Sequence, residues 1–174
     1  MSNNNQSVTT LHNLLDYNAL KFTSAEVQLK TGLQGWIDKS GSVQLKTVLQ
    51  KYLDFVKQHV KGMESLLEDE EINSLSLTNR IMHAFIEETN EKLSTCTDTE
   101  IKDVCLLASI QAINHFKISM YGTAAAFANA LGLEKLAAFF HEAEVHEKQI
   151  DDRLSQLAEH DINIKARAPI VLPG

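Results

Sequence analysis

Proline is absent from the first 168 residues of this 174-residue chain, and the whole sequence holds seven glycines. Both residue types interrupt helices, proline because it lacks a backbone donor and glycine because its backbone is so free. Nothing in this long stretch therefore forces a helix to end. The alternation of apolar and polar residues that is typical of a strand does not occur. The sequence predicts an all-α protein.

Apolar residues recur at steps of three and four along four long segments, which is the spacing of an amphipathic helix. The segment Ser40 to Ser42 separates the first helix from the second, and Gly132, which suits a left-handed helix end, separates the third from the fourth. Thr97 and Glu100 form a capping-box pattern at the start of the third. The predicted long helices occupy residues 11–36, 45–66, 97–131 and 136–157.

The connections between these helices predict the topology. Short turns make the first and second helices antiparallel neighbours, and likewise the third and fourth, whereas residues 68–97 form a long link with a shorter helical pattern. One long crossover is typical of the ferritin-like four-helix bundle. The sequence therefore predicts a ferritin-like bundle over residues 9–160, with an extra short helix in the crossover, a disordered N-terminus (1–8) and an extended C-terminal tail (161–174).

One ionisable residue lies on the apolar stripe of each long helix: Glu26, His59, Lys117 and Glu147. Lysine is almost never fully buried without a partner, so Lys117 requires an explanation. All four residues lie within about one turn of the middle of their helix. In an antiparallel bundle they should therefore meet in one layer. Four further polar residues lie close enough to join it: Asn114, His115, Glu144 and His146.

Ferritin-like di-metal proteins build their centre in such a layer, from a Glu on each of two helices and a Glu-x-x-His on each of the other two. Val56 stands three residues before His59, where that pattern requires a glutamate. A single ion held by His59, Glu26, Glu147 and either His115 or His146 is an alternative. The candidate metal ligands are Glu26, His59, Glu147, Glu144 and His146, and His115 is an alternative fourth ligand.

Asn114 and Lys117 occupy two inward positions of the third helix, where a di-metal bundle would carry acids. Glu26, Glu147 and Lys117 together carry a formal charge of about minus one, against about minus four for a site with four glutamates. Two divalent ions would then leave uncompensated positive charge in a low-dielectric core. We therefore expect a metal-free bundle, in which the Lys117 ammonium bridges Glu26 and Glu147.

Three segments resemble the bacterial YciF-like family of ferritin-like stress proteins: SAEVQL at residues 24–29, NHFKISMYGTA at 114–124 and RLSQLAEHDIN at 153–163. The resemblance covers nearly the whole chain. It implies an all-helical dimer linked to stress responses, with a possible metal site and no settled activity. Glu26 and Glu147 match acidic positions of the family, whereas Asn114 and Lys117 stand where the family has glutamates.

Charge and composition narrow the classes of partner. The net charge of −7 and the pI near 5.5 argue against binding nucleic acid or an anionic membrane through bulk electrostatics. No apolar run reaches the roughly 20 residues that span a bilayer, and MSNNNQS lacks the features of a signal peptide. A cytoplasmic location is expected.

Two other patterns predict no chemistry. In HEAEVHE, His141 and His146 are five residues apart, whereas a zincin needs its two histidines four apart on one helix face. Cys96 and Cys105 form no CxxC or zinc-type spacing and are expected to be ordinary thiols.

The resemblance implies a stress-associated homodimer, and the residues of the polar layer predict that it has no cofactor and acts structurally or by interaction. The alternative is an enzyme: a di-iron or di-manganese carboxylate protein that acts as an oxidase or a peroxide scavenger.

Overall fold

The computed structural model describes residues 7–69 and 77–167, and within these ranges it is helical and has no strand. Residues 1–6, 70–76 and 168–174 lie outside the described part, and with them most of the predicted disordered N-terminus and half of the predicted tail. The long helices are α1 (Leu11–Ile37), α2 (Val43–Asp69), α3 (Arg80–Thr95), α4 (Thr99–Ala130) and α5 (Glu134–Leu157).

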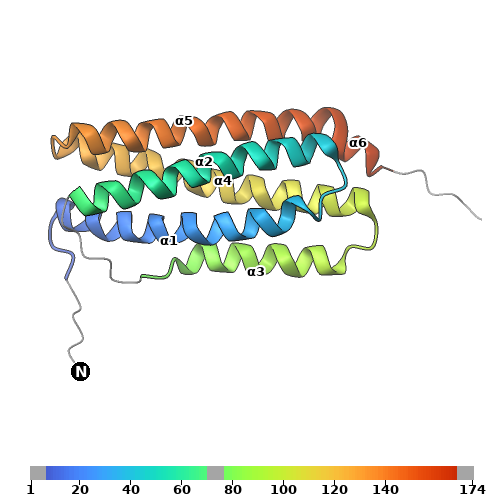
Figure 1. Ribbon diagram of the computed structural model, residues 1–174, viewed down its shortest axis with the longest axis horizontal. Helices are drawn as coiled ribbons and strands as arrows, with labels where there is room; N and C mark the ends of the chain where they lie inside the picture. Colours follow the sequence, from blue (N-terminus) through green and yellow to red (C-terminus); the bar gives the residue numbers. More distant parts are fainter. Residues whose placement is uncertain (1–6, 70–76, 168–174) are drawn as a thin grey trace, which may run out of the picture.

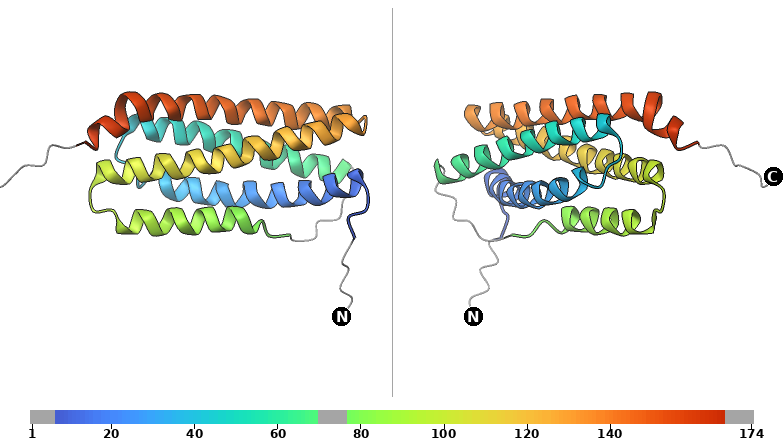
Figure 2. Two further views of the ribbon diagram at one scale, coloured as in Figure 1. Left: turned by 180° about the vertical axis from the view of Figure 1, so that it is seen from behind. Right: turned by 45° about the vertical axis from the view of Figure 1, so that its right-hand side comes forward.

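Four of these helices form the predicted bundle (Figures 1 and 2). Short turns join α1 to α2 and α4 to α5, so each pair is antiparallel, and α1 also packs on α4 and α2 on α5. The long crossover from α2 to α4 carries α3, which lies outside the bundle along α1 and α4 (Figure 1). This connectivity is the predicted one for a four-helix bundle with a single long crossover.

Local chemistry accounts for the start of α1 and for the turn between α4 and α5. Thr10 caps α1 by accepting a hydrogen bond from the backbone N–H of Asn13 at 3.1 Å, and Gly132 has φ 70° between α4 and α5, as predicted. The predicted capping box at Thr97 is wrong. Asp98 is the extended residue before α4, so Glu100 falls too early in the first turn to complete the box.

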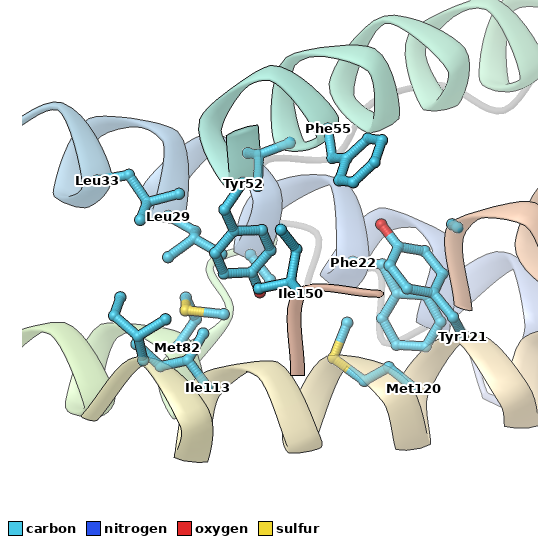
Figure 3. Close-up of a cluster of buried hydrophobic side chains, with 14 of the residues drawn as sticks. Phe22, Leu29, Leu33, Tyr52, Phe55, Met82, Ile113, Met120, Tyr121 and Ile150 are labelled. Carbon is cyan, nitrogen blue, oxygen red and sulfur yellow. The ribbon is translucent and has the colours of Figure 1, made fainter. Parts of the chain in front are cut away.

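The core lies between the bundle helices α1, α2, α4 and α5, and it combines aliphatic with aromatic side chains. Figure 3 shows Tyr52 on α2 and Tyr121 on α4 directed into the interior among Leu29, Ile113 and Met120. Trp36 is buried at the end of α1 and donates from Nε1 to Asn90 Oδ1 of α3 at 2.8 Å. Within the described ranges, none of the helices combines the length and the hydropathy that a membrane span requires.

A carboxylate of α4 holds the turn between α1 and α2. Asp103, which is buried, accepts from Ser40 Oγ at 2.8 Å, from Gly41 N at 2.9 Å and from Ser42 N at 2.8 Å. The backbone at Gly41 passes so close to α4 that a Cβ there would collide with Thr99 Cγ2. The turn therefore depends on a residue about 60 positions away in the sequence, which local patterns did not indicate.

Helical structure continues beyond residue 160, where the sequence predicted the start of an extended tail. A π-helical turn at Ala158–Ile162 is followed by α6 (Asn163–Lys165). Ile162 is 2% exposed and belongs to the hydrophobic core, and Lys165 pairs with Asp161 at 2.6 Å. Burial of Ile162 offsets the entropy cost of ordering this segment, so the helix does not end at His160.

Candidate functional site

The four ionisable stripe residues meet in one layer at the middle of the bundle. Glu26 comes from α1, His59 from α2, Lys117 from α4 and Glu147 from α5, and none of the four residues is more than 2% exposed. Because each lies near the middle of its helix, helices of similar length bring them to the same depth. The layer predicted from the sequence therefore exists in the structure.

Lys117 occupies the centre of this layer. Its Nζ lies 2.5 Å from Glu147 Oε1 and 3.0 Å from Glu26 Oε2, so one ammonium contacts both carboxylates. The contact to Glu147 has hydrogen-bond geometry, whereas the contact to Glu26 Oε2 is an ion pair without it. The ammonium also lies 4.7 Å from the centre of the Tyr52 ring, within reach of a cation–π interaction. A buried lysine thus has the paired environment that its burial requires.

Further hydrogen-bond donors complete the environment of both glutamates. Glu147 Oε2 accepts from Tyr52 Oη at 2.6 Å and from Asn114 Nδ2 at 2.8 Å. Glu26 Oε1 accepts from the Tyr121 hydroxyl and is 3.1 Å from His59 Nδ1. An ionised carboxylate only accepts hydrogen bonds. In this contact the donor is therefore the N–H group at His59 Nδ1, and Glu26 Oε1 accepts. Each charge in the layer is therefore both paired and hydrogen-bonded.

The sequence did not indicate the two tyrosines as members of the site. Tyr52 and Tyr121 lie on apolar stripes and count there as core aromatics, yet both hydroxyls reach the carboxylates. The hydroxyl of a buried tyrosine usually has a hydrogen-bond partner, so a tyrosine on an apolar stripe near the polar layer could have been predicted to bind one of its carboxylates. Burial raises the pKa of both tyrosines well above the ordinary value, and the neighbouring carboxylates add to the shift, so both remain neutral donors.

The two carboxyl groups titrate differently. Burial acts to raise the pKa of Glu26, but the Lys117 charge and the hydrogen bond from His59 outweigh it and lower that pKa from 4.5 to about 2. Burial raises the pKa of Glu147, the Lys117 charge opposes this shift, and the charge of Glu26 adds to it. The ammonium favours ionisation of both acids, but burial and the negative charge of Glu26 disfavour ionisation of Glu147.

A pair of histidines leads from the layer toward the surface. His59 Nε2 lies 3.2 Å from His146 Nδ1, and the two rings are nearly parallel at 5.4 Å between centres. Phe55 stacks on His146 at 4.0 Å, and the His146 side chain is 17% exposed. Partial burial lowers the pKa of His146, and proximity to His59 adds to this effect. His146 therefore lies at the edge of the layer, next to His59 rather than next to the carboxylates.

Two predicted members lie outside the layer. Glu144 lies one helical turn before Glu147, but its side chain packs over Gly122 of α4 and pairs with Lys148 at 2.6 Å instead of entering the layer. His115 is 63% exposed and pairs with Asp151 at 2.8 Å, because it follows the inward-facing Asn114 directly in α4. The assignment of Glu144 as a metal-ligand candidate and of His115 as an alternative ligand does not agree with this geometry.

The layer contains three side chains of the metal-ligand type. Glu26, His59 and Glu147 each offer a ligand atom, and these three atoms lie within 4.8 Å of one another. The Lys117 ammonium, however, contacts both carboxylates from the space between them. A cation there repels a metal ion, and the residual charge of about minus one cannot balance two divalent ions. The residues present do not fit a di-metal centre, and a single ion would have to displace Lys117.

Two known proteins are similar to this chain over most of its length. Protein YciF of Escherichia coli (strain K12) is 29% identical over 144 residues, which is 82% of this chain and 87% of YciF. The crystal structure of this E. coli stress protein has a TM-score of 0.84 at 26% identity and covers 90% of this chain and 99% of the other.

A second solved structure, YcfI from Rhodopseudomonas palustris, for which a structural role has been suggested, has a TM-score of 0.82 at 21% identity. It covers 87% of this chain and 96% of its own, and at this identity it supports the fold alone. The family described as "Domain of unknown function (DUF892)" matches residues 10–167. This chain therefore belongs to the DUF892 family of YciF-like proteins.

Proposed function

We propose that this protein acts structurally or through protein interaction during a stress response, and that its bundle interior is a metal-free ion-pair layer rather than a di-metal centre. The observation that carries the proposal is the position of Lys117, whose ammonium contacts Glu26 and Glu147 where a metal would need the same oxygens. The role in stress is taken from YciF, which is described as a stress protein. A cytoplasmic location is part of the same proposal.

Metal analysis tests this proposal directly. Protein produced in medium supplemented with iron and manganese, and purified without chelator, should contain far less than one ion of either metal per chain, because Lys117 holds both carboxylates. Mass spectrometry of the metals after acid digestion measures this ratio. Two ions per chain would contradict the proposal, and one ion per chain would do so as well, since a single ion also requires Lys117 to move.

A variant with restored acids provides the matched positive control. Val56→Glu, Asn114→Glu and Lys117→Glu together return the acids that a di-metal bundle uses, and we expect this variant to bind ferrous iron in a titration. Adding Glu26→Gln to the same variant should weaken the binding. If the triple variant binds no more iron than the unmodified protein, loss of these acids is not the reason for a metal-free layer.

The alternative function is a metal-dependent oxidase or peroxide scavenger. The observation that favours it is the group formed by Glu26, His59 and Glu147, with His146 beside it. This function requires bound metal, so the same analysis decides between the two. The positive charge of Lys117 in the same layer disfavours binding of a metal cation, and therefore also this function.

We also propose a homodimer in solution. An outward-facing groove between α1 and α3 has apolar lining from Val27, Gly32, Gly35 and Ile86, and Val27 is 41% exposed. Exposed apolar surface of this kind favours association. Light scattering coupled to size exclusion should give about twice the chain mass of 19.4 kDa. A single-chain mass that persists as the concentration is raised would contradict the dimer.

A further inference from the structure

Two thiols lie side by side at the corner between α3 and α4. Cys96 is the residue that ends α3, and Cys105 lies in the second turn of α4. Their Sγ atoms are 3.3 Å apart, although nine residues separate them in the sequence. The α3–α4 turn reverses the chain and brings the two side chains together, which the spacing alone did not indicate.

The pair lies at the surface of the bundle, within reach of small solutes. Both cysteines are half-buried, and neither forms a disulfide. Cys96 Sγ lies 3.2 Å from the Lys92 carbonyl oxygen, to which its S–H can donate. Burial raises the pKa of Cys105 and the adjacent Cys96 adds to this shift, whereas the Lys92 charge opposes it. Two sulfurs alone do not make a zinc site, which needs about four ligands.

The distance between the sulfurs is small enough for a covalent bond. A disulfide has an S–S length of about 2.05 Å, so the two atoms must approach by little more than one ångström. Cys96 has an extended backbone outside the helix, with φ −79° and ψ 129°, so its side chain can rotate without disturbing α3. Cys105 packs against the edge of the hydrophobic core, whereas Cys96 does not, so rotation of the Cys96 side chain can close the distance without repacking the core.

We propose that Cys96 and Cys105 form a site of reversible oxidation, at which a hydroperoxide closes an intramolecular disulfide. One thiolate attacks the O–O bond and takes one oxygen as a sulfenic acid, while hydroxide leaves and is protonated. The second thiol attacks the sulfenic sulfur, the S–S bond forms and water leaves. In total, two thiols and one hydrogen peroxide give one disulfide and two waters, so the cysteines are oxidised and the peroxide is reduced. A thiol reductant reduces the disulfide back to two thiols.

The disulfide would fasten the end of α3 to α4. Closing this loop restricts the unfolded chain, so the oxidised protein should melt at a temperature higher by about 3–8 °C. This site is separate from the ion-pair layer, and its oxidation does not depend on the function proposed for that layer.

Intact-mass measurement after alkylation tests the proposal. The reduced full-length protein is treated with hydrogen peroxide, quenched with N-ethylmaleimide and compared with an untreated sample. We expect two maleimides per untreated chain and none per oxidised chain, whose own mass falls by two hydrogens. Peptide mapping should join Cys96 to Cys105 within one chain, and dithiothreitol should restore both labels.

Cys96→Ser and Cys105→Ser are the matched controls. Each retains one thiol, so peroxide should give a sulfenic acid that dimedone traps, without an internal disulfide and without the rise in melting temperature. The proposal is overturned if the unmodified protein keeps both labels at peroxide levels that oxidise the single variants. The proposal is also overturned if peroxide converts the cysteines to sulfinic or sulfonic acids without a disulfide, or if the disulfide forms only between two chains.

Discussion

Replacing Lys117 with methionine is expected to lower the free energy of unfolding by about 3–5 kcal/mol, because it leaves two buried carboxyl groups without their ammonium partner. Methionine keeps most of the volume of lysine, so little of the loss would come from a cavity. Lys117 Nζ contacts both Glu26 and Glu147, and all three side chains are fully buried. Urea unfolding at pH 7, followed by circular dichroism, measures the change.

A neutral layer is the matched control for this variant. Glu26→Gln and Glu147→Gln added to Lys117→Met remove the unpaired charges and keep the side-chain shapes, so most of the lost stability should return. Replacing both members of a buried ion pair by neutral groups changes stability little, whereas removing one member leaves an unpaired buried charge and strongly destabilises the fold. A loss below about 1 kcal/mol in the single variant would contradict the pairing, because such a loss is typical of an exposed pair.

The pH dependence gives this prediction a second readout. The folded pKa of Glu26 is lowered to about 2, so its stabilising contribution is present above the ordinary pKa of 4.5 and is lost as the pH falls from there through 2. Without Lys117, burial raises the pKa of both carboxyls above 4.5. Their ionisation then destabilises the folded protein at neutral pH, and this destabilisation disappears as the pH falls toward 4.5. The difference in stability between the unmodified protein and Lys117→Met should therefore narrow from pH 8 to pH 5.

Replacing Asp103 with alanine is expected to cost about 2–4 kcal/mol, because three donors of the α1–α2 turn lose their acceptor at once. The carboxylate binds the Ser40 hydroxyl and the backbone N–H groups of Gly41 and Ser42 at 2.8–2.9 Å. Burial of Asp103 prevents water from replacing these bonds freely. Urea unfolding measures the loss, and hydrogen exchange should show faster exchange of the Gly41 and Ser42 amides.

Glu100→Ala is the control for that variant. Glu100 is an exposed acid in the first turn of the same helix, so its removal should cost less than about 1 kcal/mol through the helix dipole alone. If Asp103→Ala is no more destabilising than Glu100→Ala, the three hydrogen bonds do not hold the turn.

Most of the fold could be predicted from the sequence because helices are specified locally. Apolar residues three and four apart define a buried face, and the absence of proline lets each helix run its full length. The depth of Glu26, His59, Lys117 and Glu147 along their helices was sufficient to predict that they meet. The short helix after residue 160 was not predicted, because its formation depends on burial of Ile162 against the core.

The contacts within the site could not be predicted in the same way. Tyr52 binds Glu147 and Tyr121 binds Glu26, each across 95 residues of sequence. Whether a hydroxyl reaches a carboxylate depends on the rotation and axial shift of one helix against another, to within about an ångström. The same uncertainty explains why Glu144 was expected in the layer but faces Gly122 and Lys148.

The sequence by itself determined the helical class, the single crossover and the presence of a lysine among the acids of the core, because each follows from residue type and periodicity. Only the tertiary structure decided which atoms meet: the ammonium between two carboxylates, the carboxylate that holds a turn, and the two thiols at the α3–α4 corner. Periodicity fixes which face of a helix is buried, whereas packing of side chains between helices fixes the distances on which ion pairing and thiol chemistry depend.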